Sequence, residues 1–326
     1  MKGRIKQIPD NHACGKPLGR GRWFGSLRAI ARCRRPFCHR QEGLDSLRWG
    51  IMRSHYCLQL ICLILPIFVK AQPAVAAKVK LGVRSPITFK ESAALGSAAQ
   101  LKMRLRSADT PEAYDVTRES FEILVPKGYK DSTPHGLFIW ISPGDRPSIS
   151  PEWEKVLADK KLIFIGAAKS GNNRPVFDRM RLAIDANDQM RQMYNVDAKR
   201  VYVSGHSGGS RVASMLAVAY ADMFTGAACF MGVNFFTPTQ GKGGTVYEAR
   251  YIPHPEIAVL AQQQSRIALV TGDKDMNQDN TKAIYEQGFL ANDFKGVKLF
   301  DIPGQTHSAP SKDWLEKVLS FLDAGK

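Results

Sequence analysis

Short, nearly continuous apolar runs alternate with segments of helical periodicity through most of the chain after residue 135. Runs of this kind are typical of strands that are buried on both faces, as in parallel sheets. The predicted strands span residues 136–141, 162–167, 201–204, 225–233, 266–271 and 297–302. Apolar residues at near-helical spacing predict helices over residues 151–161, 177–194, 212–219, 279–290 and 311–324.

This alternation predicts an α/β fold, in which a doubly wound, mostly parallel sheet is connected by right-handed crossovers. Two earlier strands, 101–105 and 119–125, are expected to form an antiparallel beginning of the sheet. Two segments lie outside this alternation of strands and helices. One is residues 168–176, which are rich in Gly and Asn, and the other is the longer excursion of the chain over residues 234–256. Each is either a plain surface loop or the wall of a pocket, because ligands of open α/β sheets bind outside the carboxyl ends of the strands.

The beginning of the chain differs from the rest in charge. Residues 1–53 carry 13 of the 46 Lys and Arg residues but 3 of the 30 Asp and Glu residues, so most of the net charge of +16 belongs to this leader. The remainder is mildly basic. Such a charge affects solubility and weak electrostatic steering, and it does not predict a nucleic-acid partner.

Residues 52–76 have the layout of a secretory signal peptide, with a positive start, an apolar run and small residues before an A-x-A cleavage site at 74–76. A second possible cleavage site is 69–71. The apolar run, 56–69, is shorter than the roughly 20 residues of a transmembrane helix, so no stable membrane anchor is expected. The mature domain, 77–326, is therefore expected to be secreted or periplasmic.

Two interpretations of residues 1–51 remain open at this point. They are either a gene-model extension ahead of a true start at Met52, or a long basic segment of the signal peptide.

Cysteine usage follows the same division of the chain. Five of the six cysteines precede residue 63, and only Cys229 lies in the body, where no disulfide framework can form. Cys33, Cys38 and His39 match no zinc-ligand spacing and no second ligand pair follows them. We therefore expect neither a metal site nor an organic cofactor.

The run 201–204 leads into a G-x-S-x-G turn, Gly205-His206-Ser207-Gly208-Gly209, and a long run of small residues follows. A serine between a strand and a helix in such a turn is held in a strained backbone conformation with its hydroxyl exposed, and the flanking glycines let the two backbones pass closely. Ser207 is the predicted nucleophile.

A serine hydroxyl needs an imidazole to take its proton and a carboxylate to orient that imidazole. The loop after strand 266–271 offers Asp273 and Asp275, and its G-x-x-D spacing favours Asp275. The loop after strand 297–302 offers His307, which alone of the histidines in the body lies between the last strand and the last helix. His206 is expected to pack under Ser207 rather than to act on it.

Two backbone N–H groups should stabilise the oxyanion that forms when the serine attacks. One is expected from Gly208, at the amino end of a helix whose dipole favours negative charge. The second is expected from the loop after strand 136–141, where Gly144 and the backbone of Asp145 are the candidates.

In these residues the chain resembles the α/β-hydrolase superfamily, and within it the secreted esterases akin to polyhydroxybutyrate depolymerases and feruloyl or acetylxylan esterases. The resemblance rests on residues 194–209, 271–275 and 303–307. The chain order Ser207, Asp275, His307 is the order of the catalytic triad in that superfamily. The family has His-Gly after its third strand, whereas this chain has Pro143-Gly144.

The sequence thus predicts a secreted serine hydrolase that cleaves a small-molecule or polymeric carboxylic ester through an acyl-enzyme. Two alternatives remain: a serine peptidase of the same fold, and a non-catalytic binding protein that retains the fold. The oligomeric state and the natural substrate are left open.

Overall fold

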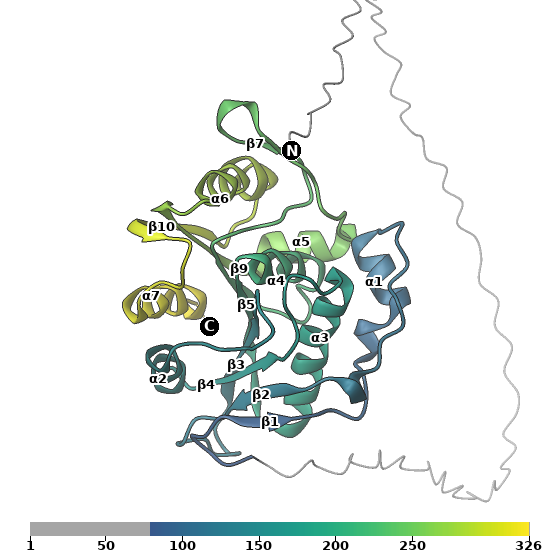
Figure 1. The fold of residues 1–326 in the computed structure, drawn as a ribbon, viewed down its shortest axis with the longest axis vertical. Helices are drawn as coiled ribbons and strands as arrows, with labels where there is room; N and C mark the ends of the chain where they lie inside the picture. The colour runs from purple at the N-terminus through teal and green to yellow at the C-terminus, as the bar shows by residue number, and fades with distance from the viewer. Residues whose placement is uncertain (1–78, 326) are drawn as a thin grey trace, which may run out of the picture. The chain divides into compact units, whose positions relative to one another are not determined.

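The computed structural model describes residues 79–325. Strands from this part of the chain form a mixed sheet of eight strands (Figure 1). The strand order is β1-β2-β4-β3-β5-β6-β9-β10. β2 pairs antiparallel with both β1 and β4, and all the other neighbours are parallel. The predicted leader, the signal peptide and the five early cysteines lie outside the described residues.

The strands have the following bounds: β1 (Ser85–Ile87), β2 (Phe121–Leu124), β3 (His135–Ile141), β4 (Leu162–Ala167), β5 (Val196–His206), β6 (Gly226–Phe230), β9 (Arg266–Lys274) and β10 (Val297–Thr306). Side chains of β3 alternate between two hydrophobic clusters, Leu137 and Ile139 in one and Phe138 and Trp140 in the other. The sheet is therefore buried on both faces, which explains why its strands are continuous apolar runs.

Helices cover both faces of the sheet, as Figure 1 shows. One face carries α1 (Ala98–Leu105), α3 (Val176–Met193), α4 (Gly208–Ala219) and α5 (Pro255–Gln264). The other face carries α2 (Pro151–Asp159) and α7 (Lys312–Asp323). The predicted doubly wound, mostly parallel sheet is confirmed. None of the described helices is long and apolar enough to cross a membrane.

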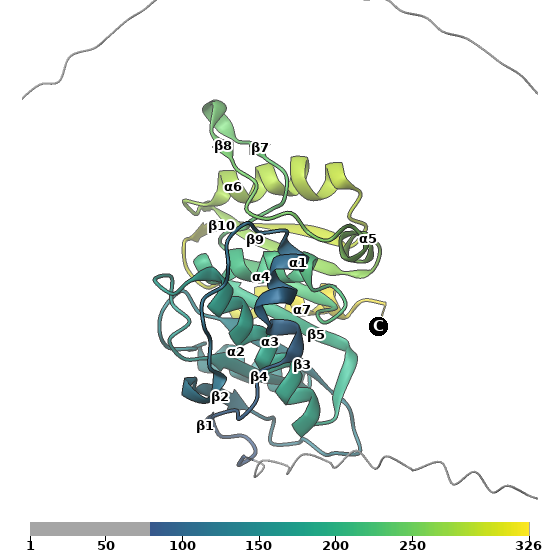
Figure 2. The same cartoon turned by 90° about the vertical axis from the view of Figure 1, so that its right-hand side faces the viewer.

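Shorter elements complete the described part of the chain. α6 (Gln278–Ala283) continues into a π-helical turn, η4 (Ile284–Phe289), and a 3₁₀ turn, η5 (Leu290–Asn292). Other 3₁₀ turns are η1 (Ala94–Gly96), η2 (Val116–Arg118) and η3 (Lys242–Gly244). The excursion 234–256 contains an antiparallel hairpin, β7 (Thr239–Gln240) and β8 (Val246–Tyr247), which projects beyond α6 in Figure 2.

The predicted strand 101–105 is wrong, because these residues belong to α1. The Ser97 side chain caps the helix by accepting a hydrogen bond from the Gln100 N–H. Leu101, Arg104 and Leu105 are buried at the i, i+3 and i+4 spacing of one helix face. The Arg104 guanidinium donates two hydrogen bonds, of 2.6 and 2.7 Å, to the Asp222 carboxylate, which connects the helix to the turn that follows α4.

Other elements also differ from the expected ones. β5 begins earlier than predicted, at Val196, and β9 and β10 end later, at Lys274 and Thr306. β1 and α5 were not predicted, and β6 ends at Phe230 rather than at residue 233. Positive φ angles at Met231 (59°) and Gly232 (149°) turn the chain away from the sheet at this point.

Candidate active site

The sharp turn between β5 and α4 places Ser207 at the carboxyl edge of the sheet. Its φ and ψ are 54° and −119°, a conformation that non-glycine residues seldom adopt. The Ser207 N–H donates to the Phe230 carbonyl oxygen of β6 at 2.8 Å, which holds the turn in place. A Cβ on Gly209 would collide with the Ile141 carbonyl oxygen, and one on Gly205 would lie 2.5 Å from the Gly209 carbonyl carbon. The close passage of strand and helix therefore requires glycine at both positions.

The structure brings Ser207, His307 and Asp275 into direct contact. Ser207 Oγ and His307 Nε2 lie 2.8 Å apart, and His307 Nδ1 and Asp275 Oδ1 lie 2.6 Å apart. The three side chains come from the carboxyl ends of β5, β9 and β10, which run parallel and so end at one edge. Strand direction thus assembles residues that are far apart in the chain.

Asp275 is held by groups that orient its carboxylate toward His307. Thr271 Oγ1 donates to Oδ2 at 2.8 Å, and the Asn277 N–H donates to Oδ1 at 3.1 Å. The Asp275 side chain is fully buried. The alternative acid, Asp273, is exposed near the end of β9 and accepts the Gly304 N–H at 2.6 Å, which joins it to β10 just before His307.

His206 lies against His307, with ring centroids 5.1 Å apart and the rings inclined at 52°. Burial, and to a smaller extent the neighbouring His307, lowers the pKa of His206 from 6.5 to about 4. Its Nε2 atom is buried and has no hydrogen-bond partner among the described residues. The His206 ring is therefore neutral near pH 7 and packs against the side of His307.

The proposed oxyanion donors differ in their surroundings. Gly208 begins α4, so its N–H lies in the first turn of the helix, where backbone donors have no partner within the helix. The Gly144 N–H donates to Ser142 Oγ at 3.1 Å and is already engaged. The Asp145 N–H donates to no group among the described residues, and the carbonyl oxygen of Asp145 accepts the Lys169 N–H at 2.7 Å.

The segment 168–176 could be a loop or a pocket wall from sequence alone. In the structure it packs on the turn 205–209 between β5 and α4, which is called the elbow below. The Asn172 N–H donates to the Pro143 carbonyl oxygen at 3.0 Å, and a Cβ on Gly208 would collide with the Asn172 side-chain amide. The segment therefore joins the loop after β3 to the start of α4. Sequence reasoning did not single out Asn172 or Asn277, and only the Gly- and Asn-rich composition of 168–176 pointed to the former.

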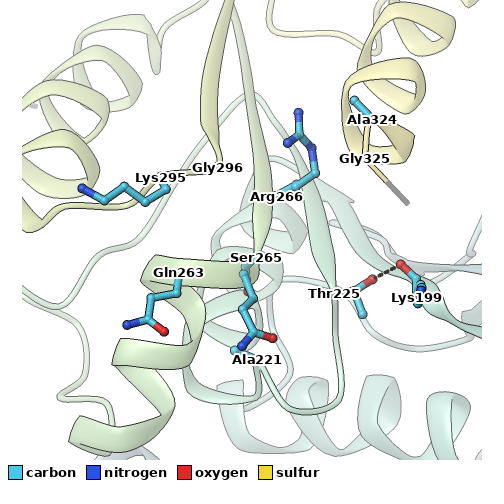
Figure 3. A pocket seen from close by; sticks show the side chains of 11 residues that line it. Lys199, Ala221, Thr225, Gln263, Ser265, Arg266, Lys295, Gly296, Ala324 and Gly325 are labelled. Atoms are coloured by element: carbon cyan, nitrogen blue, oxygen red, sulfur yellow. Dashed lines mark hydrogen bonds between the residues drawn. The ribbon is translucent and has the colours of Figure 1, made fainter.

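A separate hollow of about 430 Å³ lies at the opposite edge of the sheet. Its lining includes Thr225, Ser265 and Gly296, which directly precede β6, β9 and β10, and Lys199 in the first half of β5 (Figure 3). None of the predicted site residues lines it. The hollow therefore lies at the amino ends of the strands, away from Ser207.

The fold follows from three observations taken together. The second strand, β2, runs antiparallel to the other strands of the sheet. A strained turn with a serine follows β5. A carboxylate follows β9 and a histidine follows β10, in the chain order of that fold. The chain has the α/β-hydrolase fold.

No protein-family model and no curated protein matches the sequence of this α/β-hydrolase-fold chain. Solved structures match it at low identity. A candidate dipeptidyl aminopeptidase IV from Bacteroides ovatus matches 74% of this chain at a TM-score of 0.49 and 15% identity, and the match covers 35% of that longer protein.

Two smaller proteins are matched over most of their own length. One is S-formylglutathione hydrolase from Staphylococcus aureus, with a TM-score of 0.48, 11% identity and coverage of 75% of this chain and 97% of that one. The other is a feruloyl esterase module from Clostridium thermocellum complexed with sinapinate, with a TM-score of 0.46, 14% identity and coverage of 63% and 81%.

Proposed function

We propose that the protein is a serine hydrolase that cleaves carboxylic esters through an acyl-enzyme intermediate. The observation that supports this most strongly is the continuous hydrogen-bonded path from Ser207 Oγ through both ring nitrogens of His307 to Asp275. A buried carboxylate, an imidazole and a serine hydroxyl in this order supply the base and the orienting group that a serine nucleophile requires.

In the first half of the reaction, Ser207 Oγ attacks the ester carbonyl carbon while its proton passes to His307 Nε2. The Gly208 and Asp145 N–H groups donate to the resulting oxyanion. The bond from the carbonyl carbon to the alcohol oxygen then breaks, and His307 Nε2–H gives its proton to that oxygen as the alcohol leaves. Asp275 accepts the His307 Nδ1–H throughout and stabilises the imidazolium.

In the second half, a water molecule attacks the acyl carbonyl carbon and gives a proton to His307 Nε2. The bond to Ser207 Oγ breaks, and His307 returns the proton to the serine. The products are a carboxylic acid, an alcohol and free enzyme. Asp145 is assigned as the second oxyanion donor because the Gly144 N–H is engaged by Ser142 Oγ.

We also propose, from the sequence alone, that residues 52–76 are removed as a signal peptide and that the domain 77–326 acts outside the cytoplasm. Analysis of the N-terminus of the protein recovered from culture medium or periplasm tests this. An N-terminus at residue 77 is expected, and one at residue 1 would contradict the proposal.

A fluorophosphonate probe tests whether Ser207 is an activated nucleophile. The probe should label the wild-type protein at Ser207, as located by peptide mass spectrometry, and should not label Ser207→Ala. Ser308→Ala, which removes an exposed hydroxyl beside His307, is the matched control and should label like wild type. An unlabelled wild-type protein would favour the non-catalytic binding alternative, and faster cleavage of p-nitroanilides than of p-nitrophenyl esters would favour a peptidase.

A further inference from the structure

A hollow of about 470 Å³ lies beside the elbow, between the beginning of α3, the first half of α4 and the segment that carries β8. Its lining residues are Val176, Arg211, Met215, Asn234, Tyr247 and Arg250. Arg211 is one helical turn beyond Ser207, and its N–H donates to the Ser207 carbonyl oxygen at 3.1 Å. Since one turn rises about 5.4 Å, a substrate bound at Ser207 can reach this hollow with a chain of a few carbon atoms.

Arg211 is partly buried, yet its guanidinium contacts only neutral oxygen atoms. It donates to the Val233 carbonyl oxygen at 3.1 Å and to the side-chain oxygens of Asn234 and Asn277 at 3.3 and 3.1 Å. These three bonds leave about two of the five N–H donors of a guanidinium for another acceptor. Among the described residues, no carboxylate forms a salt bridge with Arg211.

Arg250 adds a second cation to the same hollow. Its backbone N–H donates to the Phe235 carbonyl oxygen at 3.0 Å, whereas its exposed guanidinium has no acidic partner in the described part of the chain. Burial, and after it the proximity of Arg250, lowers the pKa of Arg211 below its ordinary value. The two guanidinium groups therefore repel each other across a space that no anion of the protein fills.

Two carboxylates that act on lining residues of the hollow, Asp275 on Arg211 and Asp279 on Tyr247, are already engaged by other groups. Asp275 accepts hydrogen bonds from His307 and Thr271. Asp279 accepts the Tyr247 hydroxyl at 2.7 Å and the Lys242 N–H at 3.1 Å. Asp109 and Glu248 lie near Arg250 in the structure and in the chain, respectively, and neither of them forms a salt bridge with either arginine. Asp275 and Asp279 form none either, so the hollow keeps two cations without a direct acidic partner in the described part of the chain.

We propose that this hollow binds a carboxylate of the substrate, so that the preferred esters carry a negatively charged carboxylate a few carbon atoms from the scissile carbonyl. A carboxylate there would take the remaining Arg211 donors, pair with Arg250 and remove the repulsion between the two cations. The apolar side chains of Val176 and Met215 would contact the carbon chain that links the two groups. This inference rests on the proposed ester hydrolase function.

A pair of esters that differ only in charge tests the proposal: p-nitrophenyl hydrogen glutarate, with a free carboxylate, and p-nitrophenyl methyl glutarate. The full-length wild-type protein should hydrolyse the charged ester with a kcat/KM about tenfold higher, because a charge-assisted hydrogen bond is stronger than a neutral one. The preference should fall toward one in Arg250→Gln, because kcat/KM for the charged ester falls by more than kcat/KM for the methyl ester. It should also weaken in concentrated salt.

Lys199→Gln is the matched control, since it removes one positive charge at the opposite edge of the sheet and should keep the wild-type preference. Equal hydrolysis of the two esters by wild type, or a preference that Arg250→Gln leaves intact, would overturn the proposal while leaving the ester hydrolase function standing.

A binding measurement separates the two proposals if neither ester is cleaved. Calorimetry with monomethyl glutarate should show binding to the wild-type protein and about tenfold weaker binding to Arg250→Gln, and dimethyl glutarate should bind no better to wild type than to the variant. The absence of monomethyl glutarate binding would overturn the carboxylate site.

Discussion

His307 Nε2 lies 2.8 Å from Ser207 Oγ, although 100 residues separate them in the chain. The contact depends on the parallel pairing of β5, β6, β9 and β10, which brings the ends of these strands to one edge. It depends also on the Gly304 N–H, whose hydrogen bond to Asp273 joins the ends of β10 and β9 just before His307. The site geometry is therefore set by the pairing of the strands and by this contact at their ends.

Asp275→Asn should lower kcat by about 10³ to 10⁴-fold. An amide in place of the carboxylate presents a donor or a weaker acceptor to His307 Nδ1 and favours the wrong imidazole tautomer. Asp273→Asn is the matched control, because Asp273 is exposed and the Asn side-chain oxygen can still accept the Gly304 N–H, so kcat should stay within a few fold of wild type. Steady-state hydrolysis of p-nitrophenyl butyrate by the two purified variants measures this. Equal losses in both variants would contradict the assignment of Asp275.

His206 should make the protein less stable in mild acid. Its pKa is about 4 in the folded protein and near 6.5 when unfolded, so between these pH values the unfolded chain binds more protons. The free energy of unfolding should therefore fall as the pH is lowered from 6.5 to 4. Urea unfolding of wild type and His206→Phe at several pH values tests this. The variant keeps an aromatic ring and should lose less stability across that window, and an identical pH dependence would contradict the prediction.

Gly209→Ala should destabilise the elbow by more than about 2 kcal/mol, because its Cβ would collide with the Ile141 carbonyl oxygen and push apart β3 and α4. Gly128→Ala is the matched control: no atom lies within 4 Å of the Cβ position, and the change should alter stability by less than about 0.5 kcal/mol. Denaturant unfolding of both variants provides the comparison. A Gly209→Ala protein as stable as the control would show that the turn has room for a side chain.

Sequence reasoning reached the turn at Ser207 and the residues that follow β9 and β10 because each strand contains a recognisable apolar segment. β9 is buried from Ile267 to Gly272, whereas β10 lies at the edge of the sheet and buries only Phe300 and Ile302. It preferred Asp275 to Asp273 from spacing alone, and only the fold shows that Thr271 and Asn277 hold the first toward His307 while Gly304 holds the second away. The hydrophobic periodicity of the sequence does not predict that these residues lie close together in the fold.

The errors have a similar cause. Residues 101–105 alternate apolar and basic side chains, which is a strand pattern, but the pairing of Arg104 with Asp222 stabilises a helix there. The charge of Arg211 is visible in the sequence, whereas its lack of an acidic partner emerges only from the packed structure.

The most direct test of the proposed function is the rate of p-nitrophenyl butyrate hydrolysis by Ser207→Ala compared with wild type. Removal of the hydroxyl should lower kcat by at least about 10⁴-fold, with thermal unfolding unchanged within a few degrees, because no acyl-enzyme can form. Wild-type activity in the folded Ser207→Ala variant would contradict the central claim that this serine is the nucleophile.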